Sequence, residues 1–206
     1  MEGRLLCVAI GYLFGCVLTA DIVARVKIHR SAADIGTGNP GMANIMEQLG
    51  FKAGIVTLLG DIGKTVLMFL TVRAVCPGLG TLAVAYGGFG TILGHNFPFW
   101  RKFKGGMGVA VTCSVIVLIS PVWGMAANLL GGVTVLIFHY LATAAVLIPG
   151  AFIAPAFIFY GREVGWLAVA WTVLMAYEHS PGLIRMTKGT EKPVDIIGKI
   201  KKNNKK

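Results

Sequence analysis

Long apolar runs separated by short polar or glycine-rich stretches make up most of this chain. A helix needs about 20 mainly apolar residues to cross a bilayer, and it must satisfy its own backbone polar groups there. The breaks predict membrane spans near residues 4–25, 54–75, 79–97, 107–120, 122–138, 141–160 and 162–178. We therefore expect an all-α integral membrane protein, a bundle of about seven transmembrane helices with polar glycine-rich cytoplasmic loops. Six spans are the alternative.

The composition agrees with a membrane protein. Hydrophobic residues make up 55% of the chain and charged residues only 14%, whereas soluble domains carry about 25% charged residues. The 206 residues leave no room for a separate soluble domain beside the spans. We expect one transmembrane domain over residues 1–192 and a basic cytoplasmic tail over residues 193–206.

Basic residues are unevenly shared between the two ends of the predicted bundle. With the N-terminus outside, seven basic residues fall in inside loops and eight more follow from Arg185 onward, while only Arg4, Arg73 and Arg162 lie outside. Basic residues favour the cytoplasmic side of a membrane protein. This split predicts an outside N-terminus, an inside C-terminus and cytoplasmic glycine-rich loops.

The net charge of +10 suggests an anionic partner. Basic residues beside a membrane attract anionic lipid by about 1 kcal/mol each. Binding to single-stranded nucleic acid usually adds aromatic residues among the basic ones, and that pattern is missing here. We expect membrane lipid as a partner and no nucleic acid. The cysteines lack the spacing of metal ligands, so no metal site is expected.

The first candidate site is the loop GTGNPGMAN, residues 36–44. Its glycines formally match a dinucleotide fingerprint, but they follow a membrane helix rather than a strand, which excludes that interpretation. Glycines still permit close backbone approach, and consecutive amides bind anions. The loop predicts a phosphate site that also uses Thr37, Asn39 and Asn44. A simple turn between helices is the alternative.

The second candidate site is KFKGGMG, residues 102–108, which places Lys104 at the start of a predicted helix. Helix N-termini attract anions through their free N–H groups, and a lysine adds a full charge. This loop therefore predicts a second phosphate site. His95, in the preceding segment LGHNFP, is expected at the same interface, either as part of the site or as a structural residue.

Further polar residues lie within or beside the apolar runs. Asp61 and Lys64 share one helix face, which predicts an ion pair that serves a site or locks helices together. At the end of the last run, His179, Arg185 and Glu191 are candidates for a base, a phosphate clamp and a positioning carboxylate.

These motifs together resemble a known family. The order GTGNPGMAN, DIGK, LGHNFPFWRKFKGGMGVA and YEHSPGLIRMTKGTE is similar to that of the bacterial acyl-phosphate glycerol-3-phosphate acyltransferases of the PlsY type. The motifs of that family read GSGNxGATN, DxxKG, LGHxxPxxxxFKGGKGVAT and HRxNIxRLxxGxE. The resemblance covers almost the whole chain, in order and with matching spacing, and an ordered set is far more specific than one glycine loop.

The resemblance implies a seven-helix enzyme of the bacterial inner membrane. It would transfer an acyl group from acyl phosphate to the 1-hydroxyl of glycerol-3-phosphate, giving lysophosphatidic acid without acyl-CoA, a metal or another cofactor. Residues matching the motifs would take the family's roles. Catalysis would fall to Thr37, His179 and Glu191. Phosphate binding would fall to Gly36, Gly38, Asn39, Gly41, Asn44, Lys104, Gly105, Gly106 and Gly108, supported by Asp61, Lys64, His95 and Arg185.

The chain also departs from the family pattern. Ala33 stands where the family has an arginine, and Met107 replaces the second lysine of KGGKG. Uncharged residues also replace family polar groups at Cys16, Ala43, Ser180 and Gly182. Two function classes therefore stay open: an acyltransferase, and a non-catalytic or substrate-shifted membrane paralogue that binds lipid or phosphate ligands. A small transporter is a third, weaker alternative, because paired repeats are absent.

Overall fold

A computed structural model describes residues 1–191 and 193. Within these residues the chain forms α1 (Glu2–Gly15), α2 (Thr19–Ile28), α3 (Met42–Leu49), α4 (Phe51–Val75), α5 (Thr81–Asn96), α6 (Val109–Ile119), α7 (Pro121–Phe138), α8 (Leu141–Tyr160) and α9 (Arg162–Thr187). Short 3₁₀ turns lie at η1 (Ala32–Asp34), η2 (Pro77–Leu79) and η3 (Phe99–Arg101). The described part of the chain holds no strand, which confirms the all-α prediction. The tail predicted over residues 193–206 lies outside the described residues except for residue 193.

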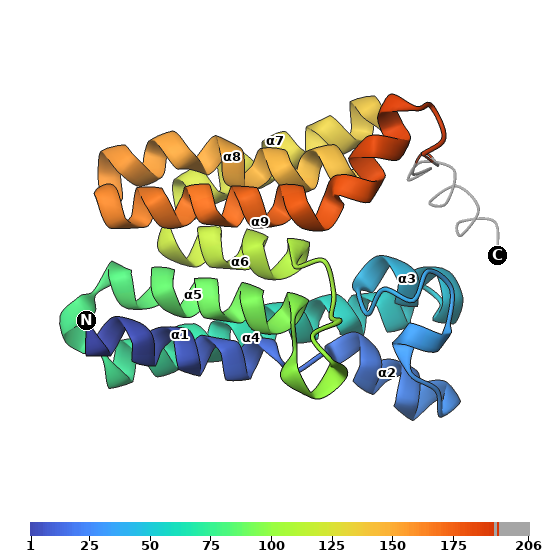
Figure 1. The fold of residues 1–206 in the computed structure, drawn as a ribbon, viewed down its shortest axis with the longest axis horizontal. Coiled ribbons are helices and arrows are strands. Elements are labelled where there is room, and N and C mark those ends of the chain that lie inside the picture. Colours follow the sequence, from blue (N-terminus) through green and yellow to red (C-terminus); the bar gives the residue numbers. More distant parts are fainter. Residues whose placement is uncertain (192, 194–206) are drawn as a thin grey trace.

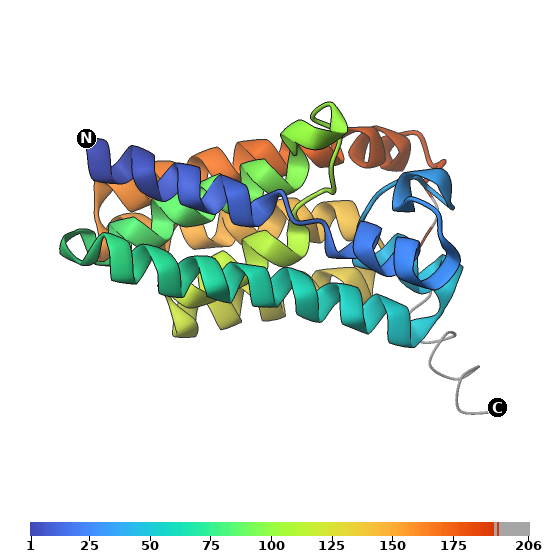
Figure 2. The same cartoon turned by 90° about the horizontal axis from the view of Figure 1, so that it is seen from below.

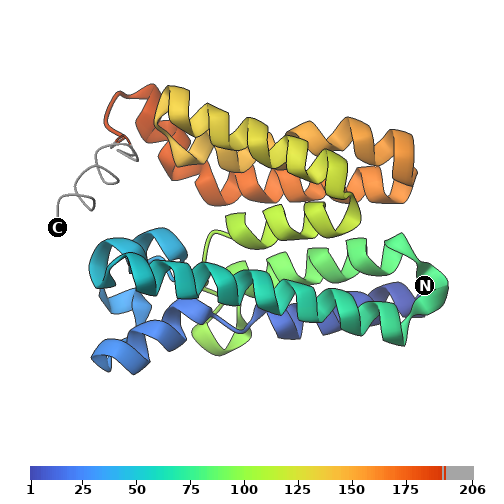
Figure 3. The same cartoon turned by 180° about the vertical axis from the view of Figure 1, so that it is seen from behind.

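The long helices run side by side in two groups (Figure 1). One group holds α1, α4 and α5, the other holds α7, α8 and α9, and α6 lies between them (Figures 1 and 3). The short helices α2 and α3 lie at one end of the bundle, opposite the N-terminus (Figure 2). The C-terminal end of α9 reaches this same end, so both glycine-rich loops and the end of α9 lie on one side of the bundle.

Most of the predicted spans correspond to helices of the structure. By length and apolar composition, the stretches Glu2–Ile28, Phe51–Val75, Pro121–Phe138 and Leu141–Tyr160 are able to cross a membrane. By contrast, α6 has 11 residues, and at 1.5 Å per residue it rises only about 16 Å, roughly half of the hydrocarbon core. Large apolar side chains such as Leu59, Leu129 and Ile158 are exposed on the outside of the bundle, as expected for a surface that faces lipid.

The helices differ from the prediction in three main ways. The predicted span 4–25 is not one helix, because the chain breaks between the end of α1 at Gly15 and the start of α2 at Thr19. The segment 42–49, expected in a loop, forms α3. The last helix runs past residue 178 to Thr187. Hydropathy does not detect the break, because it depends on polar contacts from Lys64 and Trp100 far along the chain, and it does not detect α3, because eight residues are too few for a membrane span.

The tightest packing in the fold joins α1 to α5. On α1, a Cβ added at Gly11 would collide with the carbonyl oxygen of Gly87. On α5, one added at Gly90 would collide with the carbonyl of Val8, and one at Gly94 with that of Tyr12. Small residues allow helix backbones to approach closely in a membrane, where dispersion contacts replace the hydrophobic effect as the driving force. The glycines therefore set the spacing of the two helices that lead into the loops.

Replacing Gly90 by leucine should force α1 and α5 apart. Overpacking costs about 1 to 3 kcal/mol in a close-packed interior, and the clash here is with backbone that cannot rotate away. We expect Gly90→Leu to lower the thermal unfolding midpoint of the detergent-purified protein. Gly132→Leu on α7 is the matched control, since nothing lies within 4 Å of a Cβ built there. Equal midpoints for the two variants would contradict the close-packing account.

Candidate functional site

The first glycine-rich loop is organised around the buried side chain of Asn44, at the start of α3. Its amide nitrogen donates to the carbonyls of Ala32 (3.4 Å), Ile35 (3.1 Å) and Asn39 (3.0 Å), and its oxygen accepts the backbone N–H of Thr37 (3.0 Å). Asn44 was expected to contact phosphate directly. The structure instead commits both ends of its amide to the loop, so Asn44 fixes the shape of the loop.

The backbone conformation of this loop depends on two glycines. Gly36 and Gly38 have φ values of +54° and +74°, in a region that disfavours side chains. A Cβ at Gly36 would also collide with the Asn44 oxygen. Thr37, between them, is exposed, and its hydroxyl oxygen accepts a 3.4 Å bond from the N–H of Asn39. The loop therefore presents the Thr37 hydroxyl on its outer side.

The second glycine-rich loop packs against the end of α5. The N–H groups of Gly105 and Gly106 donate to the carbonyls of Asn96 (2.8 Å) and His95 (2.9 Å). Side chains at Gly105, Gly106 or Gly108 would collide with these residues, and Gly108 also has a φ of +74°. The amides of Gly105 and Gly106 were expected to bind phosphate. They are already used, because they satisfy carbonyls that the last turn of α5 leaves free.

The side chain of Lys104 remains available. It is exposed and lines a pocket of about 360 Å³ between the second loop and α9, together with Asn96, Phe97, Phe103, Gly105, Tyr177, Glu178, Ser180 and Pro181. Asn96 is only 2% exposed, and neither atom of its side-chain amide has a hydrogen-bond partner among the described residues. The pocket thus combines an ammonium, a carboxylate and an amide with unused hydrogen-bonding capacity.

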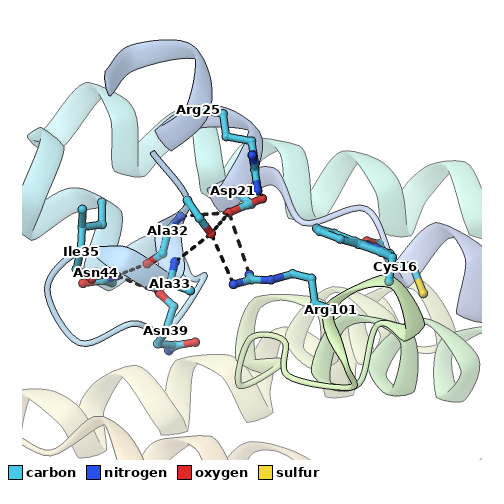
Figure 4. Close-up of polar contacts among 11 residues, drawn as sticks. Cys16, Asp21, Arg25, Ala32, Ala33, Ile35, Asn39, Asn44 and Arg101 are labelled. Atoms are coloured by element: carbon cyan, nitrogen blue, oxygen red, sulfur yellow. Dashed lines mark hydrogen bonds and ion pairs between the residues drawn. The ribbon is translucent and has the colours of Figure 1, made fainter. Parts of the chain in front are cut away.

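The segments that lead into the two loops meet in a polar cluster around Asp21 of α2 (Figure 4). One carboxylate oxygen accepts the Ser31 hydroxyl (2.6 Å) and the Ala32 N–H (2.9 Å), and the other accepts Nε of Arg25 (2.8 Å). Arg101, at the end of η3 and directly before the second loop, reaches the same place and donates to the Ser31 hydroxyl oxygen (3.4 Å). From the sequence alone, Arg101 is one of the seven basic residues of the inside loops, since nothing in RKFK separates a half-buried arginine from exposed lysines.

The predicted Asp61–Lys64 pair exists, and it closes the break in the first span. The Lys64 ammonium lies 2.9 Å from Asp61 Oδ1, donates to Nδ1 of His95 (2.8 Å), and also donates to the carbonyls of Gly15 (3.4 Å) and Val17 (2.7 Å). Those carbonyls belong to the segment where α1 stops. Asp61, Lys64 and His95 therefore form a buried structural lock, and this arrangement favours the locking role among the predicted alternatives.

Removing the lock cation should destabilise the fold. Truncating one partner of a buried ion pair typically costs about 3 to 5 kcal/mol, because the other charge stays buried and uncompensated. We expect Lys64→Met to lower the unfolding midpoint far more than Lys52→Met, which removes an exposed lysine at the start of α4. Asp61→Asn in the Lys64→Met background should recover part of the loss, because it removes the stranded carboxylate. A midpoint equal to that of the wild type would refute the lock.

The end of α9 holds the remaining predicted residues. His179 is 4% exposed and its Nδ1 lies 3.0 Å from the Met175 carbonyl, which makes Nδ1 the donor and leaves Nε2 as an acceptor. Burial lowers the pKa of His179, which lies just beyond the predicted span, so the imidazole is neutral at pH 7. Met175 contacts Gly108, and His179 follows it by one turn, on the helix face toward the second loop.

Arg185 and Glu191 bind each other. Nε of Arg185 donates to a carboxylate oxygen of Glu191, whose N–H in turn donates to the Arg185 carbonyl (3.2 Å). Arg185 was expected to clamp phosphate, but its charge is balanced by Glu191. Within residues 1–191 and 193, no hydrogen bond joins Thr37, His179 and Glu191 to one another, and no three metal-ligating side chains gather. The first loop and the end of α9, which carry these predicted catalytic residues, therefore lie at one end of the bundle, and no hydrogen bond links the three side chains.

Known proteins match this chain over nearly its whole length. The family model described as glycerol-3-phosphate acyltransferase matches residues 5–189. Glycerol-3-phosphate acyltransferase 1 of Lactobacillus johnsonii is 36% identical over 94% of this chain and 93% of its own. The glycerol-3-phosphate acyltransferase of Bordetella pertussis is 32% identical over 94% and 92%.

Solved structures share the fold. The crystal structure of PlsY (YgiH), an integral membrane glycerol 3-phosphate acyltransferase, in its glycerol 3-phosphate form superposes with a TM-score of 0.84 at 24% identity, over 96% of this chain and 98% of that chain. The lysophosphatidic acid form of PlsY gives a TM-score of 0.80 at 26% identity, over 92% and 94%. The helical arrangement described above is thus that of an integral membrane protein.

Proposed function

The chain belongs to the glycerol-3-phosphate acyltransferase family, and on that premise we propose that it transfers an acyl group from acyl phosphate to the 1-hydroxyl of glycerol-3-phosphate. The products would be lysophosphatidic acid and inorganic phosphate. The similar PlsY structures hold glycerol 3-phosphate in one case and lysophosphatidic acid in the other, which supports the acceptor and the product. Acyl phosphate as donor rests on the motif resemblance.

One observation carries the proposal. Both glycine-rich loops and the end of α9 lie at the same end of a membrane bundle (Figure 1). Lys104 lines a pocket there together with Glu178 and Asn96. A phosphorylated polyol needs a cation for its phosphate and hydrogen-bonding groups for its hydroxyls. A long acyl chain needs the bilayer beside the site. The positive-inside pattern would put this end in the cytoplasm, where glycerol-3-phosphate is dissolved.

The proposed chemistry is direct acyl transfer. The 1-hydroxyl oxygen forms a bond to the acyl carbon, the bond from that carbon to the phosphate oxygen breaks, and inorganic phosphate leaves. Nε2 of the neutral His179 accepts the hydroxyl proton. The Thr37 hydroxyl and Lys104 stabilise negative charge on the phosphates and on the carbonyl oxygen. Glu191 holds Arg185 in place at the rim.

Acyl transfer by the purified protein tests the proposal. With acyl phosphate and glycerol-3-phosphate supplied in a lipid mesophase or detergent, we expect release of phosphate and formation of lysophosphatidic acid. A folded wild-type protein that transfers nothing would favour the non-catalytic or substrate-shifted paralogue, a possibility motivated by Ala33 and Met107.

Lys104→Ala should reduce transfer strongly. A charged hydrogen bond contributes about 1.5 to 3 kcal/mol, so its loss should lower kcat/KM by roughly 10- to 100-fold. Lys52→Ala is the control, because Lys52 is an exposed lysine at the same end of the bundle and lines no described pocket. If both variants transferred acyl groups at the wild-type rate, Lys104 would have no role in binding.

Met107→Lys should strengthen substrate binding, because it restores the second lysine of the family motif beside Lys104. We expect the KM for a phosphate-bearing substrate to fall by about 10-fold, the value of one added charge contact. Met107→Leu keeps the size without the charge and should leave the KM unchanged. If the KM of Met107→Lys is no lower than that of Met107→Leu, the pocket does not need a second positive charge at position 107.

A further inference from the structure

Arg101 carries an unusual guanidinium group. Its side chain is only 12% exposed, although it belongs to a loop at the end of the bundle. Nη2 donates to the Ser31 hydroxyl oxygen at 3.4 Å, a long bond, and Nη1 has no hydrogen-bond partner among the described residues. A guanidinium has five N–H donors, and leaving them unused in a buried place is costly. Cζ of Arg101 lies 5.7 Å from the centre of the Trp100 ring, and its unpaired N–H groups leave hydrogen-bonding capacity for an anion.

The nearest carboxylate, that of Asp21, does not act as the anion bound by Arg101. Nη1 of Arg101 lies 4.0 Å from Asp21 Oδ1, too far for a hydrogen bond. The same carboxylate already accepts bonds from the Ser31 hydroxyl, the Ala32 N–H and Nε of Arg25 at 2.6, 2.9 and 2.8 Å. The Asp21 carboxylate is therefore paired closely with Arg25 and only at 4.0 Å with Arg101.

The guanidinium also lies beside position 33. The Ser31 hydroxyl oxygen accepts the Ala33 N–H at 3.2 Å as well as Nη2 of Arg101, so both groups contact the same atom. Figure 4 shows Arg101 reaching from η3 toward Ala32 and Ala33 of η1. Motif comparison places the family arginine at position 33, where this chain has alanine.

We infer that Arg101 binds the phosphate of one of the two substrates, supplying from η3 the guanidinium that Ala33 of η1 cannot supply. The inference rests on the proposed acyl transfer. A guanidinium suits phosphate because its planar fork donates two parallel hydrogen bonds. Nη2 is held by the Ser31 hydroxyl, whereas Nη1, which lies 4.0 Å from Asp21 Oδ1, is covered by protein atoms and has no hydrogen-bond partner among the described residues. Nη1 is therefore the donor left for a phosphate, and the atoms that cover it must move when the phosphate binds.

The test measures the KM for acyl phosphate and for glycerol-3-phosphate separately. Arg101→Gln should raise one of them by about 10- to 100-fold, the loss expected for a charged contact, with kcat changed only a few-fold. The affected substrate identifies the phosphate that Arg101 binds. Adding Ala33→Arg to Arg101→Gln should restore much of that KM, because an arginine then reaches the same place from position 33. Lys52→Gln, which removes an exposed cation at this end of the bundle, should change neither KM.

Other outcomes would overturn the inference. Unchanged KM values in a folded Arg101→Gln protein, or lower kcat and stability at unchanged KM, would mean that Arg101 only ties the loops together. If Arg101→Gln does not fold, Arg101→Lys keeps the charge without the fork. It should then show an intermediate KM, and a wild-type KM would reject the inference.

A wild-type protein without transfer activity would defeat the proposed function but not decide the role of Arg101. Calorimetric titration with glycerol-3-phosphate and with a non-hydrolysable acyl phosphate then replaces the rate measurement. Binding of either compound that is lost in Arg101→Gln supports the phosphate site. Equal binding by wild type and variant, or no binding of either compound to wild type, rejects it.

Discussion

The arrangement of this protein depends on a break in its first membrane segment and on the ammonium group that closes it. Where α1 stops, its last carbonyls lose their helical partners, and unsatisfied carbonyls in an apolar interior cost several kcal/mol each. Lys64 donates to the carbonyls of Gly15 and Val17, and the Trp100 indole donates to that of Cys16 at 2.8 Å. Asp61 balances the buried ammonium. Side chains from two other parts of the chain therefore satisfy the carbonyls of Gly15, Cys16 and Val17 at the break.

Both candidate loops are positioned by that break. Beyond it, α2 carries Asp21, whose carboxylate fixes the start of the first loop through Ser31 and Ala32. Just before the second loop, the Trp100 indole donates to the Cys16 carbonyl and so connects that loop to the break. His95 joins the two systems, since its ring accepts from Lys64 and its carbonyl accepts from Gly106. The lock is thus connected to the second loop by hydrogen bonds through His95, and to the first loop through the segment that leads into α2.

The glycines of this chain serve three separate physical purposes. Gly36 and Gly38 allow the positive φ values of the first loop. Gly105 and Gly106 let the second loop lie against the end of α5, where their N–H groups satisfy free carbonyls. The glycines of α1 and α5 let two helices touch along their backbones. The backbone N–H groups of Gly105 and Gly106 donate within the protein, so they are not available to an anion. The groups that remain to bind negative charge at the site are Lys104, Arg101 and the outer face of the first loop.

Hydropathy and i, i+3 spacing are local properties, so the membrane class, most helix positions, the ordered motifs and the Asp61–Lys64 pair were predictable from the sequence. The motifs also show which charges are missing, at Ala33 and Met107. The packed structure was needed to find that the first span breaks, that Asn44 and the amides of Gly105 and Gly106 are used within the protein, and that Arg101 reaches Ser31. The break and the position of Arg101 depend on partners that are distant in sequence. The partners of Asn44, Gly105 and Gly106 are nearer along the chain, but the loop conformation that brings these groups together forms only when the helices pack.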